Sequence, residues 1–232
     1  MKRLIAWIPL VALLACAHVP RTVEEASVKP GINRDFLDPN LDVDAFRRRF
    51  EGESREIFAR RSAIADLLRL REGMNVADIG AGTGFFSVMF ADRVGPSGRV
   101  YAVEIAKPFV DHIRRLASER GVRNLEPILC TERSVELPEE SIDLAFVCDT
   151  YHHFEYPRST LASIRRALRP GGELVIVDFV REEGKSRDWV LQHVRAGLGA
   201  VEKELDEAGF DLVAVEPAPF LRENYFARFR RR

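Results

Sequence analysis

The sequence predicts a doubly wound α/β fold built on one mostly parallel sheet. Between residues 75 and 178, short apolar stretches alternate with helix-like stretches, and such alternation specifies parallel strands joined by right-handed crossovers. Two strand-like stretches near the C-terminus, residues 212–215 and 225–229, are expected to close a seven-stranded sheet with an antiparallel edge. A length of 232 residues, of which 46% are hydrophobic, is enough for one main domain with a sizeable core.

The individual elements follow from periodicity and from turn residues. Apolar side chains between residues 44 and 70 recur at helical intervals, and Gly52 and Ser54 are expected to divide this stretch into two helices, with Ser54 capping the second. The parallel strands are expected at residues 75–79, 100–103, 125–129, 144–148 and 173–178. The helices between them are expected at residues 85–93, 108–120 and 160–168. A last helix should end at Ala208, with Gly209 as its C′ residue.

The N-terminal residues have the order of an export signal. Lys2 and Arg3 precede an apolar stretch, residues 4–15, which ends at Cys16. This stretch is shorter than the roughly 20 apolar residues that span a bilayer, so a signal peptide is favoured over a transmembrane helix. The alternatives are an uncleaved N-terminal anchor and a wrongly assigned start codon.

The end of this stretch, Leu13-Leu14-Ala15-Cys16, resembles the lipobox of bacterial lipoproteins. The resemblance implies cleavage before Cys16 and a lipid on that cysteine. We therefore expect a signal peptide at residues 1–15, a tether at residues 16–43 and one domain at residues 44–232. The expected location is the cell envelope, at the periplasmic side of the membrane, or the cytoplasm if the signal is misread.

Charge and cysteine content exclude several classes of protein. Lys+Arg 35 against Asp+Glu 36 gives a net charge of -1, so no broad basic surface favours nucleic acid as a partner. Three cysteines are too few for a disulfide framework. The sequence leaves both alternatives for Cys130 and Cys148, a disulfide bond or two free thiols. No CxxC or His-x-x-x-His spacing is present, and we therefore expect no metal site. The oligomeric state is left open.

A glycine-rich loop follows the first expected strand. Residues 76–86 read Val-Ala-Asp-Ile-Gly-Ala-Gly-Thr-Gly-Phe-Phe, and glycines allow positive φ and close approach of a ligand to the main chain. Glu104 ends the next strand, where a carboxylate can accept hydrogen bonds from ribose hydroxyls. The dinucleotide fingerprint requires a glycine where Phe85 stands, which argues against a nicotinamide-dependent oxidoreductase.

The G-x-G-x-G loop preceded by Asp78 resembles motif I of the class I S-adenosylmethionine-dependent methyltransferases. Two later segments, residues 137–147 and 168–177, agree with the same family in order and spacing, and the resemblance covers about residues 73–230. It implies the Rossmann-like methyltransferase fold and S-adenosylmethionine as the cofactor. It also implies a set of cofactor contacts: Asp78, Gly80, Ala81, Gly82, Gly84, Glu104, Glu132 and Asp149. In this set Gly80, Ala81 and Gly82 would border the methionine end, Glu104 the ribose and Glu132 the adenine.

Methyl transfer chiefly requires a positioned nucleophile and removal of its proton. The candidates for this work follow the fourth strand, where ligands collect in an open α/β sheet. His152 and His153 are candidate general bases, and Tyr151 and Phe154 are expected to exclude water. His193 is expected on the surface without a role.

The expected function is methyl transfer to an unidentified small-molecule acceptor, selected by residues 44–70 and 180–200. The alternative is an exported lipoprotein that uses the fold as a non-catalytic ligand-binding module. Damage to the glycine loop or loss of Glu104 would favour that alternative, and both features are intact. The export signal conflicts with a cofactor that is made in the cytoplasm.

Overall fold

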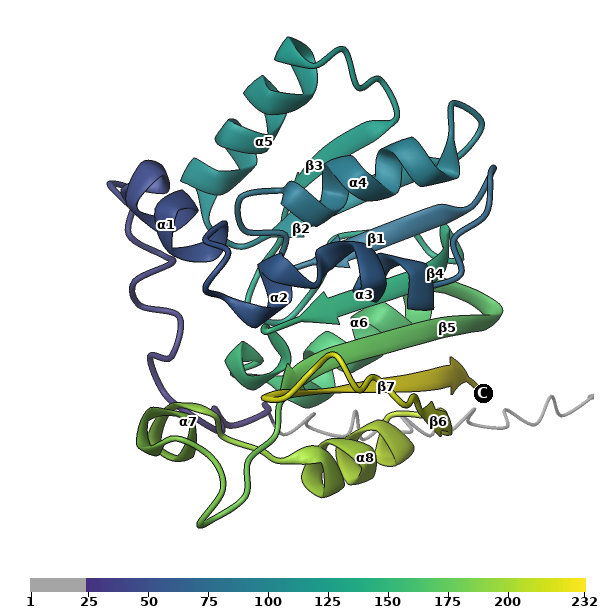
Figure 1. Cartoon of the computed structure of the whole chain (residues 1–232). Coiled ribbons are helices and arrows are strands. Elements are labelled where there is room, and N and C mark those ends of the chain that lie inside the picture. Colours follow the sequence, from purple (N-terminus) through teal and green to yellow (C-terminus); the bar gives the residue numbers. More distant parts are fainter. Residues whose placement is uncertain (1–23) are drawn as a thin grey trace, which may run out of the picture.

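A computed structural model describes residues 24–232 and centres on one seven-stranded sheet (Figure 1). The strand order is β3-β2-β1-β4-β5-β7-β6. The strands are β1 Asn75–Ile79, β2 Arg99–Glu104, β3 Leu125–Leu129, β4 Ile142–Cys148, β5 Leu168–Phe179, β6 Phe210–Val215 and β7 Asn224–Arg231. Neighbours from β3 to β5 pair in parallel, whereas β7 is antiparallel to both β5 and β6. The predicted doubly wound sheet with an antiparallel C-terminal edge is confirmed.

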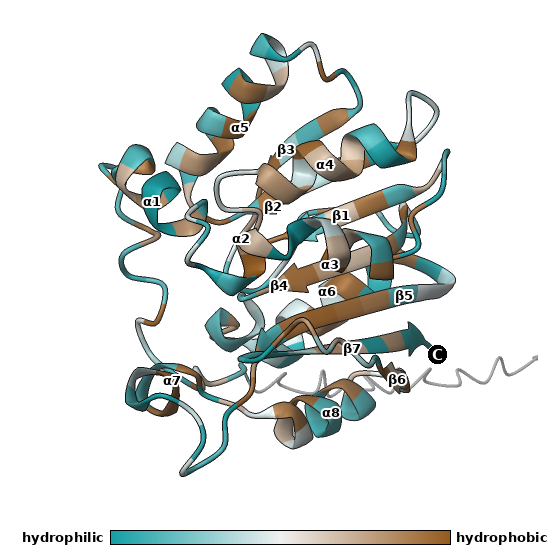
Figure 2. Cartoon of the chain, in the orientation of Figure 1, coloured by the Kyte–Doolittle hydropathy of each residue, from teal (hydrophilic) through white to brown (hydrophobic). Residues whose placement is uncertain are grey.

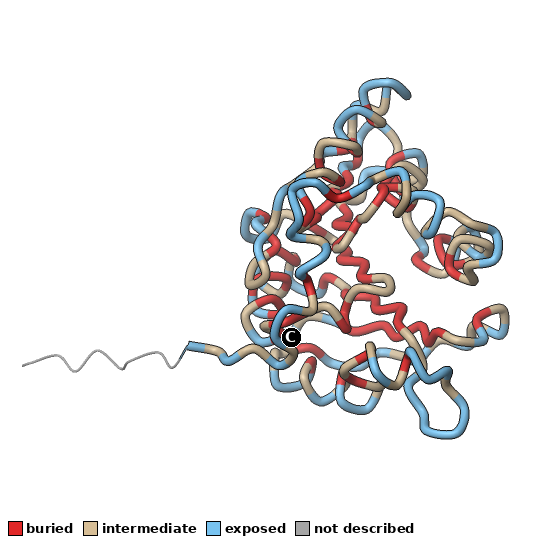
Figure 3. The backbone as a smooth tube through the Cα atoms, turned by 90° about the vertical axis from the view of Figure 1, so that its left-hand side faces the viewer, coloured by how far each residue is buried: buried red, intermediate tan, exposed pale blue. Residues whose placement is uncertain are grey.

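Helices cover both faces of this sheet. They are α1 Val43–Phe50, α2 Glu56–Ala59, α3 Arg61–Leu67, α4 Phe85–Val94, α5 Lys107–Glu119, α6 Pro157–Ala167, α7 Asp188–His193 and α8 Leu198–Glu207, with a 3₁₀ turn, η1, at Tyr151–His153. One core cluster lies between the sheet and α3, α4 and α5, and a second lies between the sheet and α6 and α8. Because β4 and the second half of β5 are covered on both faces, residues 144–148 and 174–177 are continuously hydrophobic (Figure 2). The buried backbone accordingly runs through the centre of the molecule (Figure 3).

The N-terminal helices differ from the sequence prediction. Three short helices replace the expected two, and α2 begins after Arg55 with no side-chain cap. Ser54 lies one residue too early to cap α2, within a turn closed by the Arg55 N–H and the Gly52 carbonyl oxygen. The helix that does carry a side-chain cap is α1, where Asp42 accepts a hydrogen bond from the Ala45 N–H at 3.0 Å.

The described part of the expected tether, residues 24–42, lies against the domain instead of leaving it. The Val28 N–H donates to the Glu155 carbonyl oxygen at 3.0 Å, and the Gly31 N–H donates to the Glu155 carboxylate at 3.2 Å. The Glu25 carboxylate accepts from the backbone N–H groups of Arg158 and Ser159, both at 2.8 Å, and so caps the start of α6. Residues 24–42 are therefore part of the folded unit. The expected signal peptide and the first tether residues, up to residue 23, lie outside the described residues.

Several smaller expectations can be compared with the structure. Gly209 follows the end of α8 with φ of 90°, as a C′ glycine should. Cys130 and Cys148 are both free thiols, so the disulfide left open by the sequence is not formed. Within residues 24–232, no helix combines the length and the apolar character needed to cross a bilayer.

Gly84 provides a test of the packing between α4 and α5. Its φ is +79°, and an added Cβ would lie 2.8 Å from Cγ1 of Ile113. We expect Gly84→Ala to lower the free energy of unfolding by about 1 kcal/mol through the positive φ and by a further 1–2 kcal/mol, roughly, through the overlap with Ile113. Urea denaturation measures the loss.

The matched control is Gly121→Ala, because Gly121 also has positive φ, +65°, but no atom lies within 4 Å of the added Cβ. Equal losses in the two variants would show that the contact with Ile113 adds nothing.

Candidate active site

The carboxyl ends of β1, β2, β4 and β5 open into one large cavity. Its volume is about 910 Å³, within the range of pockets that bind cofactors and small molecules. The glycine loop after β1, the end of β2 and the turn after β4 form its floor. Residues of the N-terminal segment and of α1, α2 and α7 line it as well, so elements that are far apart in the sequence share one cavity.

The glycine loop has the backbone that the sequence predicts. Gly80 and Gly82 have φ of 74° and 55°, in the left-handed region. A Cβ on Gly80 would lie 2.3 Å from Cγ2 of Thr150, so the turn after β4 packs directly on this glycine. At Gly82 the nearest atoms to an added Cβ belong to the Phe50 ring, 3.5 Å away across the cavity.

Thr83 is the next residue in the loop, and its side chain carries a hydroxyl group. In the described part of the chain, the buried Thr83 hydroxyl has no hydrogen-bond partner, and Thr83 lines the cavity. Buried polar groups are nearly always paired, so this hydroxyl fits a bound polar ligand.

Glu104 joins the glycine loop to the end of β2. The side chain is buried, and Oε2 accepts from the Gly82 N–H at 2.8 Å. Oε1 accepts from the N–H groups of Ile105 and Ala106 at 2.8 and 2.9 Å. Burial raises the pKa of Glu104, and these three backbone donors act in the opposite direction. The carboxylate lines the cavity next to the loop, where the sequence predicts a ribose contact.

Asp78 is the penultimate residue of β1, just before the glycine loop. It is buried, and it accepts a hydrogen bond from the Ser87 hydroxyl at 2.5 Å. Burial raises the pKa of Asp78 to about 7, although the bond from Ser87 lowers it. Asp78 thus fixes the start of α4 to β1, and its carboxyl group titrates near neutral pH.

Asp149 follows β4 and ties three elements together. Its φ is 47°, and its buried carboxylate accepts from Arg55 Nη2 and from Asn224 Nδ2, both at 2.7 Å. Burial raises the pKa of Asp149, and the Arg55 guanidinium opposes that shift. Arg55 and Asn224 were not predicted, since they are 94 and 75 positions away from Asp149 and belong to no local motif.

Two of the predicted cofactor residues have more peripheral positions. Glu132 is half-buried on the cavity wall, where Oε1 accepts from Asn33 Nδ2 at 3.3 Å. Ala81 lines the cavity, but Gly84 does not. Gly84 is the N-cap of α4 and packs against Ile113, so in this structure it has a packing role, and its predicted cofactor contact stays a prediction.

The two predicted histidines lie at the other end of the cavity, on η1. His152 is buried, and its Nδ1 lies 2.7 Å from Oδ1 of Asp178. Although burial lowers the pKa of His152, the Asp178 carboxylate raises it overall. Burial lowers the pKa of His153 to about 2, and His152 and His193 lower it further.

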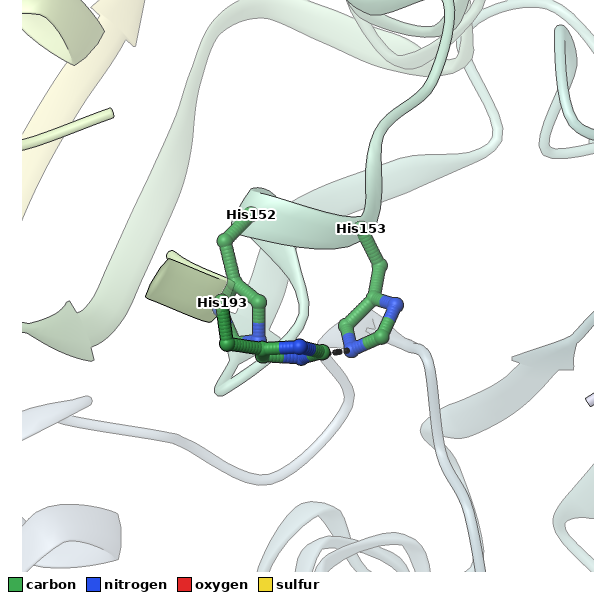
Figure 4. A group of neighbouring side chains, drawn as sticks. All are labelled: His152, His153 and His193. Carbon is green, nitrogen blue, oxygen red and sulfur yellow. Dashed lines mark hydrogen bonds between the residues drawn. The ribbon is translucent and has the colours of Figure 1, made fainter. Parts of the chain in front are cut away.

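His193 was expected on the surface without a role, and that expectation is wrong. It ends α7 and lines the same cavity, with Nε2 3.3 Å from Nε2 of His153. Burial lowers the pKa of His193 as well. Figure 4 shows the rings of His152, His153 and His193 converging from two separate elements. His153 and His193 are 40 positions apart in the sequence, so no motif with a short fixed spacing could have revealed this group of histidines.

Tyr151 was expected to shield the reacting groups, but it points away from the cavity. Its ring is buried in the core between the sheet and α8, and its hydroxyl donates to Glu204 Oε2 at 2.5 Å. Glu204 is held in turn by Arg195. Tyr151 therefore stabilises the fold and does not meet a ligand. Phe154 does line the cavity, together with the aromatic rings of Phe179 and Trp189.

Comparison with known proteins agrees with this geometry. Residues 77–176 match the family described as a methyltransferase domain. The chain is 31% identical over 151 residues to a ubiquinone/menaquinone biosynthesis C-methyltransferase of Bordetella avium, covering 62% of this chain and 57% of that protein. It is 27% identical over 181 residues to a demethylmenaquinone methyltransferase of Listeria monocytogenes, covering 66% of this chain and 76% of that protein. The chain thus spans little more than half the length of the Bordetella relative.

Solved structures share the fold. A methyltransferase dependent on S-adenosylmethionine from Aquifex aeolicus superposes with a TM-score of 0.70 at 24% identity, covering 82% of this chain and 98% of that one. The matched residues 77–176 of this chain include the glycine loop and Glu104. Residues 77–176 therefore resemble a methyltransferase domain, and the chain has the fold of a methyltransferase that depends on S-adenosylmethionine.

Proposed function

We propose that this protein transfers a methyl group from S-adenosylmethionine to a small aromatic acceptor of the quinone class, in its hydroxyl-bearing reduced form. One observation carries the proposal: a single cavity is lined both by the glycine loop and Glu104, which we assign to the cofactor, and by imidazoles and aromatic rings, which we assign to the acceptor. The two relatives with quinone-related names support the acceptor class. The non-catalytic binding module is less favoured, because the cavity keeps both a cofactor end and a group able to accept a proton.

The cofactor end has donors and acceptors suited to a nucleoside joined to an amino acid. We assign the methionine part to Gly80, Ala81 and Gly82, where the backbone is exposed to the cavity. We assign Glu104 to the ribose hydroxyls and Glu132, which lines the same cavity, to the adenine amino group. Asp149 and Arg55 hold the turn after β4 against the N-terminal helices. The cofactor supplies a methyl group on a positive sulfur, which an aligned nucleophile can attack directly.

The acceptor end has rings that fit a planar molecule. Phe179 lies 4.9 Å from Trp189, and Trp189 lies 6.0 Å from His193, measured between ring centroids. Aromatic side chains in such arrangements favour flat, partly apolar ligands. The cavity therefore provides an aromatic wall next to the histidines.

His152 is the group that we assign as the general base. Asp178 lies on its Nδ1 side and stabilises the protonated ring, which leaves Nε2 to accept a proton from an acceptor hydroxyl. Removal of that proton raises the electron density of the acceptor ring. Asp178 itself is a positioning residue. His153 is the less basic neighbour, since burial disfavours its charged form.

The proposal is tested by turnover. The full chain is incubated with S-adenosylmethionine carrying a labelled methyl group and with short-chain hydroquinones and hydroxynaphthoquinols that lack one ring methyl. We expect label in one of the quinols, with an equal amount of S-adenosylhomocysteine, because the donor loses its methyl group in the same step. Cofactor binding without label in any acceptor would instead favour the ligand-binding module.

Glu104 is the residue on which cofactor affinity should depend most directly. We expect Glu104→Ala to weaken S-adenosylmethionine binding by about 1–3 kcal/mol, because charge-assisted hydrogen bonds to the ligand are lost. Isothermal titration calorimetry measures the change. The control is Glu126→Ala on β3, whose carboxylate pairs with Arg99 at the surface at 2.9 Å and should leave the affinity unchanged. If the wild type and both variants bind S-adenosylmethionine equally well, Glu104 makes no contact with the ribose.

We also propose that the mature protein is held at the membrane by a lipid on Cys16. The support is the lipobox-like stretch Leu13-Leu14-Ala15-Cys16 after a charged and apolar leader. Mass spectrometry of the protein purified from its host should show an N-terminus at residue 16 carrying acyl groups. A Cys16→Ser variant should keep its leader and carry no acyl groups. An intact Met1 in the wild-type protein would contradict the anchor.

A further inference from the structure

Three imidazole rings from two separate elements meet at the acceptor end of the cavity. His152 and His153 come from η1, and His193 comes from the end of α7. One ring nitrogen of each lies within 4.8 Å of the corresponding atoms of the other two (Figure 4). We infer that this three-histidine cluster binds one divalent transition-metal ion, of the kind represented by Zn²⁺.

The spacing of the nitrogens fits such an ion. Nε2 of His153 and Nε2 of His193 are 3.3 Å apart. Two ligands at the usual Zn–N distance of about 2.0–2.1 Å, at the tetrahedral angle, are separated by about 3.3–3.4 Å. This pair therefore already has the separation found in a metal site. The His152 nitrogen lies within 4.8 Å of the other two, so it has to approach by at most about 1.5 Å, which a rotation of side chains around the ion can provide.

His152 has the support that a metal-binding histidine usually has. Its Nδ1 donates to Asp178 Oδ1 at 2.7 Å, and its backbone N–H donates to Oδ2 at 3.1 Å. The same carboxylate accepts from the Phe179 N–H at 2.8 Å, so its position is fixed. A carboxylate on one ring nitrogen fixes the tautomer, directs the lone pair of the other nitrogen outward and makes it a better ligand.

Aromatic rings pack against the three-histidine cluster, and the cavity borders the same cluster. The Phe36 ring packs edge-on against His153, at 5.2 Å between centroids, and the Phe179 ring packs against His152 at 5.7 Å. All three histidines also line the cavity. Three nitrogen ligands with a fourth position facing a cavity are the arrangement of catalytic zinc sites, whereas structural sites are closed by four protein ligands.

Charge and donor type decide which ions fit. The Lys29 ammonium lies 2.5 Å from the His193 carbonyl oxygen and 3.0 Å from that of Gln192, and its charge opposes any cation. The Asp178 carboxylate beside His152 acts in the opposite direction. Imidazole nitrogen is a good ligand for zinc, copper, nickel and iron and a poor one for magnesium or calcium. The site should therefore select transition metals.

The metal site competes with the base role proposed above for His152, because both use Nε2 of that histidine, but metal binding can be measured without cofactor or acceptor. A bound ion would occupy Nε2 of His152, so that nitrogen would no longer accept a proton. We expect Zn²⁺ to change turnover for this reason, but turnover is not the test.

The test is a metal titration of the full chain, purified without a polyhistidine tag and stripped with a chelator. Calorimetry with Zn²⁺ should show one ion per chain, and Co²⁺ should give the visible absorption of a site with nitrogen ligands. His153→Ala and His193→Ala should each weaken Zn²⁺ binding at least tenfold. Asp178→Asn should weaken it by about 10–100-fold, the usual effect of losing a carboxylate behind a histidine ligand.

The matched control is His112→Ala, which removes a histidine on α5 that does not belong to the cluster. Its Zn²⁺ affinity should equal that of the wild type. Circular dichroism checks that each variant is folded, and His153 and His193 are both only half-buried, so their replacement should perturb the fold less than replacement of the buried His152. The inference fails if wild-type protein binds Zn²⁺ no more tightly than the His153→Ala, His193→Ala double variant, or if His112→Ala loses as much affinity.

Discussion

The contact between the Glu104 carboxylate and the Gly82 N–H organises the cofactor end of the cavity. It connects the loop after β1 to the end of β2, and it holds the loop in a conformation with positive φ at Gly80 and Gly82. A carboxylate has about four acceptor positions, and the three backbone donors on Glu104 leave one of them open. A ligand with two neighbouring hydroxyls must therefore share the carboxylate with the loop, which couples ligand binding to the position of the loop.

Most of the fold could be predicted from local sequence. The parallel strands are short and apolar, and helices separate them, so their order along the chain already indicates a doubly wound sheet. The ends of the strands are harder to predict, because backbone pairing between strands can continue through residues that are typical of turns. Gly171 has the positive φ, 74°, that a turn at Pro170-Gly171 requires. Nevertheless β5 begins at Leu168, because Leu168 pairs with Ile142 across a register shift.

The site divides into a part that the sequence reveals and a part that only the fold assembles. The glycine loop and Glu104 could be identified because each directly follows a strand, and parallel strands bring their carboxyl ends to one edge. Arg55 and His193 reach the cavity from elements outside that pattern, and no residue near them in the sequence indicates their partners. Tyr151 was misplaced for a local reason. In a 3₁₀ turn successive side chains point about 120° apart, so Tyr151 enters the core while the next two residues face the cavity.

The N-terminal segment connects the proposed anchor to the cavity. Ile32, Asn33 and Phe36 line the cavity, so the chain that leads to Cys16 is also part of the cavity wall. On the proposed anchor, only residues 17–23 separate the lipidated cysteine from the described domain, a stretch that can span at most about 25 Å. The cavity would then stay close to the bilayer surface. An apolar acceptor dissolved in the bilayer would have a short path to the histidines, whereas the cofactor would have to reach the glycine loop from water. If the proposed anchor is formed, the same short connection would bring a membrane-soluble acceptor near the cavity and would also set the compartment from which the cofactor has to come.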